Sequence, residues 1–114
     1  MSSQAPELTV HTRTEAAAIV VAVAGEVDMV SAPILLTAIS DALATDHSRI
    51  VVDLSEVGFF GSAGLSVLVR VAEAAVGREL RIVVSEAARR PIELTGINEL
   101  LDLYSTTAQA LGGA

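Results

Sequence analysis

The sequence predicts an α/β domain in which a single mixed, mostly parallel sheet is opened by an antiparallel hairpin and covered by about four helices. Short runs rich in Val, Ile and Leu alternate with segments whose apolar residues recur every three or four positions, as strands and helices do in βαβ units. The core must be aliphatic, because 52% of the residues are hydrophobic but only 3% are aromatic. The length of 114 residues suits one domain. We expect it to span residues 7–112, after a small, polar tail at residues 1–6.

Two strands are expected to form the opening hairpin. Apolar and polar residues alternate over residues 8–13, which indicates a half-exposed strand. Residues 19–23 form an unbroken apolar run, which indicates a strand covered on both faces. A turn around Thr14 and Glu15 would join the two strands in antiparallel pairing.

The first helix and the next strand follow from local signals. Ser31 is a candidate N-cap, and Pro33 suits the first turn of a helix over residues 32–44. Residues 50–54 are expected to form a short buried strand. From its end, a loop over residues 55–61 would lead to the second helix.

The second helix shows apolar residues at helical spacing between positions 65 and 76, and Gly77 can end it in the left-handed conformation. The remaining elements are expected to be a strand at 80–84, a helix at 86–94 capped by Ser85 and ended by Gly96, an edge strand at 101–104, and a helix capped by Ser105 that ends before Gly112.

Composition excludes several kinds of function. Fourteen acidic and seven basic residues give a net charge of −7, which would repel a phosphate backbone and makes nucleic acid a poor partner. The chain has no Cys, so disulfides and thiolate chemistry are excluded. His11 and His47 are too few for a histidine metal site and are expected at the surface. The longest apolar stretch, residues 16–25, is too short to span a bilayer, so we expect a soluble, cytoplasmic protein without membrane contact.

The segment 57–65 places a serine between glycines at the start of a helix. A conformational explanation is available: Ser62 as N-cap, Gly61 for a positive φ and Gly64 for close packing of the first turn. A functional explanation is that Ser62 is exposed at the carboxyl edge of a parallel sheet, where α/β folds bind ligands. Phosphorylation there would add about −1.5 to −2 charges in the positive field of the helix terminus.

This serine does not fit a hydrolase. A nucleophile elbow reads Gly-x-Ser-x-Gly, but Phe60 stands two residues before Ser62. The two histidines lie in other segments, so no general base is at hand. Neither a Walker motif nor Gly-x-Gly-x-x-Gly occurs. We therefore expect no catalytic residues, no metal and no enzyme activity.

A second short motif, Gly25-Glu26-Val27-Asp28, lies before the first helix. Its two carboxylates have a conformational explanation, as a solvated acidic loop that suits the helix dipole. If the neighbouring strands are parallel, Glu26 and Asp28 also lie at the same edge as Ser62 and could dock basic side chains of a partner. The adjacent pair Arg89 and Arg90 is expected on a solvated helix face.

Four motifs in this order resemble the STAS-domain anti-sigma-factor antagonists along nearly the whole chain. They are Gly25-Glu26-Val27-Asp28, the run from Val52 to Phe59, Ser62-Ala63-Gly64-Leu65, and the run from Pro91 to Ile97. The resemblance implies a STAS fold and a regulatory protein that binds an anti-sigma factor with serine-kinase activity. This binding causes the anti-sigma factor to release a stress-type sigma factor. The kinase then phosphorylates the antagonist, and a PP2C-type phosphatase resets it.

Carried over to this chain, the phosphoacceptor corresponds to Ser62, and no cofactor is implied because ATP belongs to the kinase. The implied partner-binding residues are Gly25, Glu26, Asp28, Gly61, Ser62, Ala63 and Gly64. One departure is that Gly61 stands where the family usually has an aspartate, which removes a carboxylate beside the acceptor. Binding is thus better supported than phosphorylation.

Two alternatives stay open. The chain could be a non-phosphorylated STAS scaffold subunit of a transporter or lipid-trafficking complex, docked through an apolar face of the second helix. We expect Arg70, Glu73 and Arg78 on that helix, which suits a solvated face instead. A small-ligand sensor is the third possibility, although no convergent polar pocket can be identified.

Overall fold

The computed structural model describes residues 8–112 and confirms the predicted fold class. Five strands form one sheet in the order β1-β2-β3-β4-β5, and β1 pairs antiparallel with β2 while the other pairs are parallel. The strands are β1 (Leu8–Glu15), β2 (Ala18–Val27), β3 (Arg49–Phe60), β4 (Glu79–Val84) and β5 (Asp102–Tyr104). The helices are α1 (Ala32–Leu43), α2 (Ser62–Ala74), α3 (Glu86–Leu94), a 3₁₀ turn η1 (Ile97–Leu100) and α4 (Thr107–Gly112).

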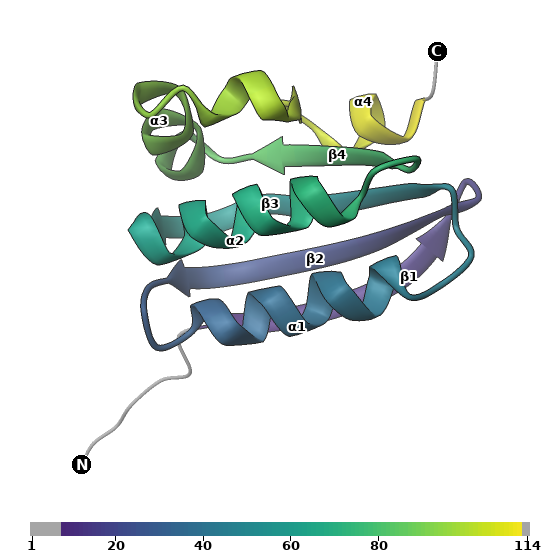
Figure 1. The fold of residues 1–114 in the computed structure, drawn as a ribbon, viewed down its shortest axis with the longest axis horizontal. Coiled ribbons are helices and arrows are strands. Elements are labelled where there is room, and N and C mark those ends of the chain that lie inside the picture. The colour runs from purple at the N-terminus through teal and green to yellow at the C-terminus, as the bar shows by residue number, and fades with distance from the viewer. Residues whose placement is uncertain (1–7, 113–114) are drawn as a thin grey trace.

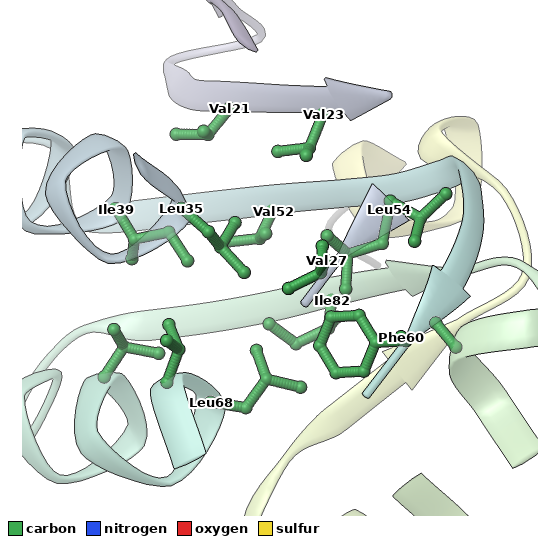
Figure 2. Close-up of a cluster of buried hydrophobic side chains, with 14 of the residues drawn as sticks. Val21, Val23, Val27, Leu35, Ile39, Val52, Leu54, Phe60, Leu68 and Ile82 are labelled. Carbon is green, nitrogen blue, oxygen red and sulfur yellow. The ribbon is translucent and has the colours of Figure 1, made fainter. Parts of the chain in front are cut away.

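The sheet buries its two faces unequally (Figure 1). One face packs against α1, α2 and α3, and alternate residues of the central strands, such as Val21, Val52 and Ile82, point into this core (Figure 2). The residues between them form a smaller cluster with Ala110 of α4. Each fully buried Val, Leu or Ile contributes about 1.5–3 kcal/mol, so the three-helix face dominates the stability of the fold.

The hairpin turn lies two residues later than predicted. Glu15 still pairs with Ala18, so the turn consists of Ala16 and Ala17, with positive φ angles of 52° and 65°. Two left-handed residues match the twist of an antiparallel hairpin. The sequence concealed this turn because alanine adopts the left-handed region at a cost and gives no turn signal.

Strands β2 and β3 are longer than predicted. Gly25 and Glu26 lie within β2, and the expected loop over residues 55–61 is strand as far as Phe60. The pairing of β2 with β3 changes register twice, between Ala22 and Ala24 and between Gly25 and Glu26. Such bulges interrupt the alternation by which a strand is identified, which explains why both strand ends were missed.

Several predicted caps are confirmed and others are wrong. Ser85 caps α3 by accepting from the Ala88 N–H at 3.1 Å, and Gly96 adopts the left-handed conformation after it. Ser31 is the N-cap residue of α1 and a proline lies in the first turn, as predicted, but the Ser31 side chain makes no capping hydrogen bond. Thr106 takes the place expected of Ser105, because the Gln109 N–H donates to its hydroxyl at 3.1 Å.

The end of α2 also differs from the expectation. The helix ends at Ala74, so Arg78 lies in the following turn and not on the helix face. Gly77 has the expected positive φ of 86°, beyond the helix end. The last helix runs through Gly112.

The remaining expectations concern the chain ends, the histidines and the membrane. The tail predicted at residues 1–6 lies outside the described residues. His11 is exposed on β1, whereas His47 is half-buried after α1, with its Nδ1 3.0 Å from the Thr45 hydroxyl. Within residues 8–112, no three potential ligands form a metal-binding group. No helix in that range is long and apolar enough to cross a membrane.

Candidate functional site

Ser62 lies at the point where β3 passes into α2. Gly61 is the N-cap residue, in extended conformation, and its N–H donates to the Val27 carbonyl at 2.9 Å. The Gly61 carbonyl accepts from the N–H groups of Gly64 and Leu65, so Ser62 is the first helical residue. The prediction that Ser62 is the N-cap is therefore wrong, because β3 runs to Phe60 and the helix begins directly after Gly61.

The side chain of Ser62 is exposed. Within the described chain, its hydroxyl has no hydrogen-bond partner, whereas Ser31 and Ser85 are both bonded to backbone groups. A serine that caps no helix and supports no turn has no conformational task. Its hydroxyl is accessible to a partner.

Gly64 fixes the helix against the sheet. A Cβ atom at this position would lie 2.8 Å from both the Phe60 ring and Val27 Cγ1, and both of these side chains belong to the core (Figure 2). The predicted close packing of the first turn is thus confirmed. The position of Ser62 relative to the ends of β2 and β3 follows from this contact.

The backbone angle of Gly61 does not require glycine. Its φ of −92° is accessible to any residue, so the expected positive φ is wrong. A Cβ atom here would lie 3.1 Å from the ring of Phe59, which is half-exposed. A larger residue at position 61 would therefore need this ring to shift by a small distance.

Asp28 holds the turn between β2 and α1. Its Oδ1 accepts from the N–H of Val30 at 3.0 Å and of Ser31 at 2.9 Å, and from the Ser31 hydroxyl at 3.1 Å. These hydrogen bonds, above all the one from the Ser31 N–H, lower the pKa of Asp28. The conformational explanation of this carboxylate is therefore supported. Glu26 is exposed on β2, and its backbone carbonyl accepts a hydrogen bond from the Ser31 hydroxyl.

The structure brings four of the seven predicted partner-binding residues into one hollow. This hollow has a volume of about 320 Å³. Gly64 is buried beneath it, and neither Gly25 nor Glu26 lines it. We call it the Ser62 hollow; its lining consists of Asp28, Met29, Phe59, Gly61, Ser62, Ala63 and Ser66.

Three lining residues were missed by the sequence analysis: Met29, Phe59 and Ser66. Met29 is 80% exposed and Phe59 is 50% exposed. Beside them, Val30 is 78% exposed. The signal that could have found Met29 and Val30 is their place between Asp28 and Ser31, because large apolar residues in a tight turn have no folding role.

A second hollow continues from the first between α1 and α2. It shares Met29, Ala63 and Ser66 with the Ser62 hollow and ends at Arg70. Arg70 is exposed, and no ion pair to it is formed within the described chain. The surface thus offers apolar walls, the hydroxyls of Ser62 and Ser66, the Asp28 carboxylate and a cation at its far end, a composition that suits protein binding.

Comparison with known proteins agrees with this arrangement. The family model described as "Mlab, STAS domain" matches residues 10–102. The anti-sigma-F factor antagonist RsfB of Mycobacterium tuberculosis is 36% identical over 97 residues, which cover 82% of this chain and 79% of RsfB.

Two solved structures extend the comparison. An anti-sigma factor antagonist from Mycobacterium paratuberculosis superimposes with a TM-score of 0.88 at 38% identity, covering 96% of this chain and 97% of that one. The phosphorylated form of the Bacillus cell fate determinant SpoIIAA shares the fold, with a TM-score of 0.60 and 19% identity over 91% of this chain and 97% of that one. The chain therefore belongs to the STAS-domain family of anti-sigma-factor antagonists.

Proposed function

We propose that this chain binds an anti-sigma factor through the Ser62 hollow and that phosphorylation of Ser62 by the kinase activity of that partner dissolves the complex. While the unmodified chain is bound, the anti-sigma factor would release its own target, a stress-type sigma factor, and this release would be the regulatory output. A PP2C-type phosphatase would restore the unmodified serine. The observation that carries the proposal is an exposed serine, free of any structural hydrogen bond within the described chain, at the rim of an apolar hollow.

The apolar residues around the serine support binding. Met29, Val30 and Phe59 are three of the seven large hydrophobic side chains that the described chain exposes, and they lie together where β2 and β3 end. Interfaces owe most of their affinity to a few such side chains near the centre of the contact. Docking a partner here would remove them from water and would place Ser62 within its reach.

The charges around the serine support the switch. A phosphate on Ser62 would lie at the first turn of α2, whose backbone N–H groups favour an anion. In the complex, the same phosphate would be desolvated in a hollow that already contains the Asp28 carboxylate. A difference of about 3–4 kcal/mol between the two forms changes affinity by roughly two to three orders of magnitude, which is sufficient for partner exchange.

The relatives support the choice of partner. RsfB is named an anti-sigma-F factor antagonist, and the structure of SpoIIAA in a phosphorylated form demonstrates that a protein of this fold accepts the modification. In this chain, Gly61 stands where the resemblance predicts a carboxylate before the acceptor, and the exposed ring of Phe59 lies beside it. The kinase that acts on this chain would therefore recognise an aromatic and glycine pair before the serine.

Calorimetric titration against anti-sigma kinases encoded in the same genome tests the proposal. We expect micromolar or tighter binding, which Ser62→Ala preserves and Ser62→Glu weakens by at least 100-fold. After ATP and Mg²⁺ are added, intact mass should increase by one phosphate in the parent protein and in Ser66→Ala, but not in Ser62→Ala. Equal affinities for the Ala and Glu variants would exclude the switch while leaving the binding role intact.

A second variant tests the location of the interface. Met29→Ala should weaken binding about tenfold or more, because it removes an exposed side chain from the centre of the proposed contact. Val76 is similarly exposed, at 84%, but lies beyond the opposite end of α2. Val76→Ala is thus the matched control, and an equal effect of the two substitutions would place the contact elsewhere.

A further inference from the structure

A larger hollow than the one at Ser62 lies between the edge strand β1 and α1. Its volume is about 740 Å³. Val10 and Thr12 of β1 form one wall, and Ile34, Ala38 and Asp41 of α1 form the other. Most of this lining is apolar, and Ile34 is 49% exposed. We call it the β1–α1 groove.

The strand beside this groove has one unpaired edge. β1 is the first strand in the sheet order and pairs only with β2 among the described strands (Figure 1). Its eight residues present a row of backbone N–H and C=O groups on the outer side. Such an edge is a template for another extended chain, and natural proteins normally shorten, cover or distort it.

The groove and the edge fit one kind of occupant. A strand added to β1 would lie about 4.8 Å from it, with side chains that alternate between the two faces of the sheet. Side chains on the helical face would enter the β1–α1 groove beside Val10 and Thr12. Proteins that recognise peptides by strand addition use this combination, in which the ladder gives affinity and the pocket reads alternate side chains.

The carboxylates that line the groove indicate which charge a bound strand would carry. The Asp41 carboxylate lines the groove, and an adjoining hollow that shares Thr45 adds Asp46. Within the described chain, no Arg lines either hollow. The nearest guanidinium groups are already engaged, because Arg78 donates to the carbonyls of Thr45 and His47 and Arg13 of β1 is paired with Glu15. The whole chain carries a net charge of −7. A second copy would carry the same net negative charge, so a basic partner fits better.

We propose that β1 and α1 form a second docking surface, which accepts an extended, basic segment of a partner protein as a sixth strand. Apolar side chains at alternate positions of that segment fill the groove, and a Lys or Arg in the same alternating set, on the same face of the strand, meets Asp41. This surface lies on the opposite side of α1 from the Ser62 hollow. Its occupation is therefore independent of the state of Ser62.

NMR titration of the full chain tests the proposal with a synthetic peptide in which Thr alternates with Val and one terminal Val is replaced by Lys (the Val-Lys peptide), so that Val and Lys share one face. We expect chemical-shift changes and increased protection from hydrogen exchange at the amides of β1, with side-chain shifts at Ile34 and Ala38. The same peptide with N-methyl groups on alternate residues cannot form a ladder and should bind at least tenfold more weakly. Equal binding of the methylated peptide, or no change at β1 with millimolar peptide, would overturn the proposal.

Two variants locate the charge contact. Asp41→Lys should weaken binding of the Val-Lys peptide about tenfold, whereas Asp102→Lys, on the opposite edge strand, should leave it unchanged. Ser62→Glu should also leave it unchanged, which separates this surface from the proposed kinase interface.

Equal losses of peptide affinity in the two Lys variants would mean that only net charge matters. A dimer in analytical sedimentation that the peptide cannot dissociate would assign the free edge of β1 to a second copy. Either result contradicts the proposal.

Discussion

The two ends of the sheet differ in what they leave exposed. At the amino end, where β3 and β4 begin, the Arg78 guanidinium donates to the carbonyls of Leu43, Thr45 and His47 at 2.8–2.9 Å. At the carboxyl end, the turn after β2 exposes Met29 and Val30 almost fully. The amino end therefore satisfies these carbonyls within the chain, although Val76 and Leu100 are also exposed there, while the carboxyl end gathers Met29 and Phe59 beside Ser62.

This difference separates stability from binding within one small domain. If Arg78 were absent, the carbonyls at the end of α1 and just after it would need water or another donor. Because Arg78 bonds them within the chain, the amino end of the sheet needs no partner to satisfy these groups. Exposed apolar residues gathered in one place contribute nothing to the isolated fold and indicate an end that is completed by a partner. Substitutions at the amino end should thus change stability, and those at the carboxyl end should mainly change affinity.

Removal of the Arg78 side chain should have the largest effect on stability. Hydrogen bonds from a charged donor contribute about 1.5–3 kcal/mol each, and water can replace part of this at a half-exposed site. We expect Arg78→Ala to lower the free energy of unfolding by about 2–3 kcal/mol, measured by urea denaturation. Arg70→Ala is the control, because Arg70 is exposed and makes no hydrogen bond within the described chain; comparable losses would refute the special role of Arg78.

Gly64 lies near the Ser62 hollow, but a substitution there should lower stability as well. An added methyl group would overlap the Phe60 ring and Val27 Cγ1 at 2.8 Å, and overpacking of this kind costs about 1–3 kcal/mol. Gly64→Ala should therefore destabilise the fold by that amount. Gly58→Ala is the matched control, since no atom lies within 4 Å of its Cβ position, and urea denaturation should show no loss there.

The hairpin turn at the amino end can be improved. Ala17 has a φ of 65°, a conformation that glycine adopts freely and alanine only with strain. Ala17→Gly should raise the free energy of unfolding by up to about 1 kcal/mol, after the entropy cost of glycine in the unfolded chain. Thermal unfolding of Ala17→Gly beside Ala108→Gly, an exposed helical position, provides the comparison, because the latter should be destabilised.

The sequence predicted those features that depend on neighbouring residues. The order of strands and helices, the Ser85 cap and the turn at Gly96 all follow from local periodicity or from one residue's preference. The N-cap at Gly61 could not be predicted in this way, because it depends on how far β3 remains paired with β2 beyond two register shifts.

Dependence on contacts between distant residues also explains what the sequence analysis missed at the Ser62 hollow and at the amino end of the sheet. The three carbonyls bound by Arg78 lie 31 to 35 residues earlier in the chain, and no local pattern connects them. The place of the Phe59 ring beside Gly61 likewise depends on the path of β3, which only the strand geometry reveals. The serine, in contrast, was found because glycines on either side of it made the segment unusual.

The smallest effect is expected from the carboxylate in the β2–α1 turn. Hydrogen bonds from Ser31 and Val30 lower the pKa of Asp28 below its ordinary value of 3.8 in the folded chain. The ionised group therefore stabilises the fold above the pKa of the unfolded chain, and this contribution is lost as pH falls through the lower, folded pKa. Asp28→Asn should be less stable than the parent protein at pH 7, and the gap should close below about pH 4.

Urea denaturation of both proteins at pH 7, 5 and 3 measures this gap. Asp46→Asn is the control, because Asp46 is exposed and makes no hydrogen bond within the described chain. A penalty for Asp28→Asn that persists unchanged at pH 3 would show that the amide disturbs the turn by its shape and not by its charge. In that case Asp28 would retain its role as the acceptor that orders the turn, and the stable orientation of Met29 beside Ser62 would depend on geometry alone.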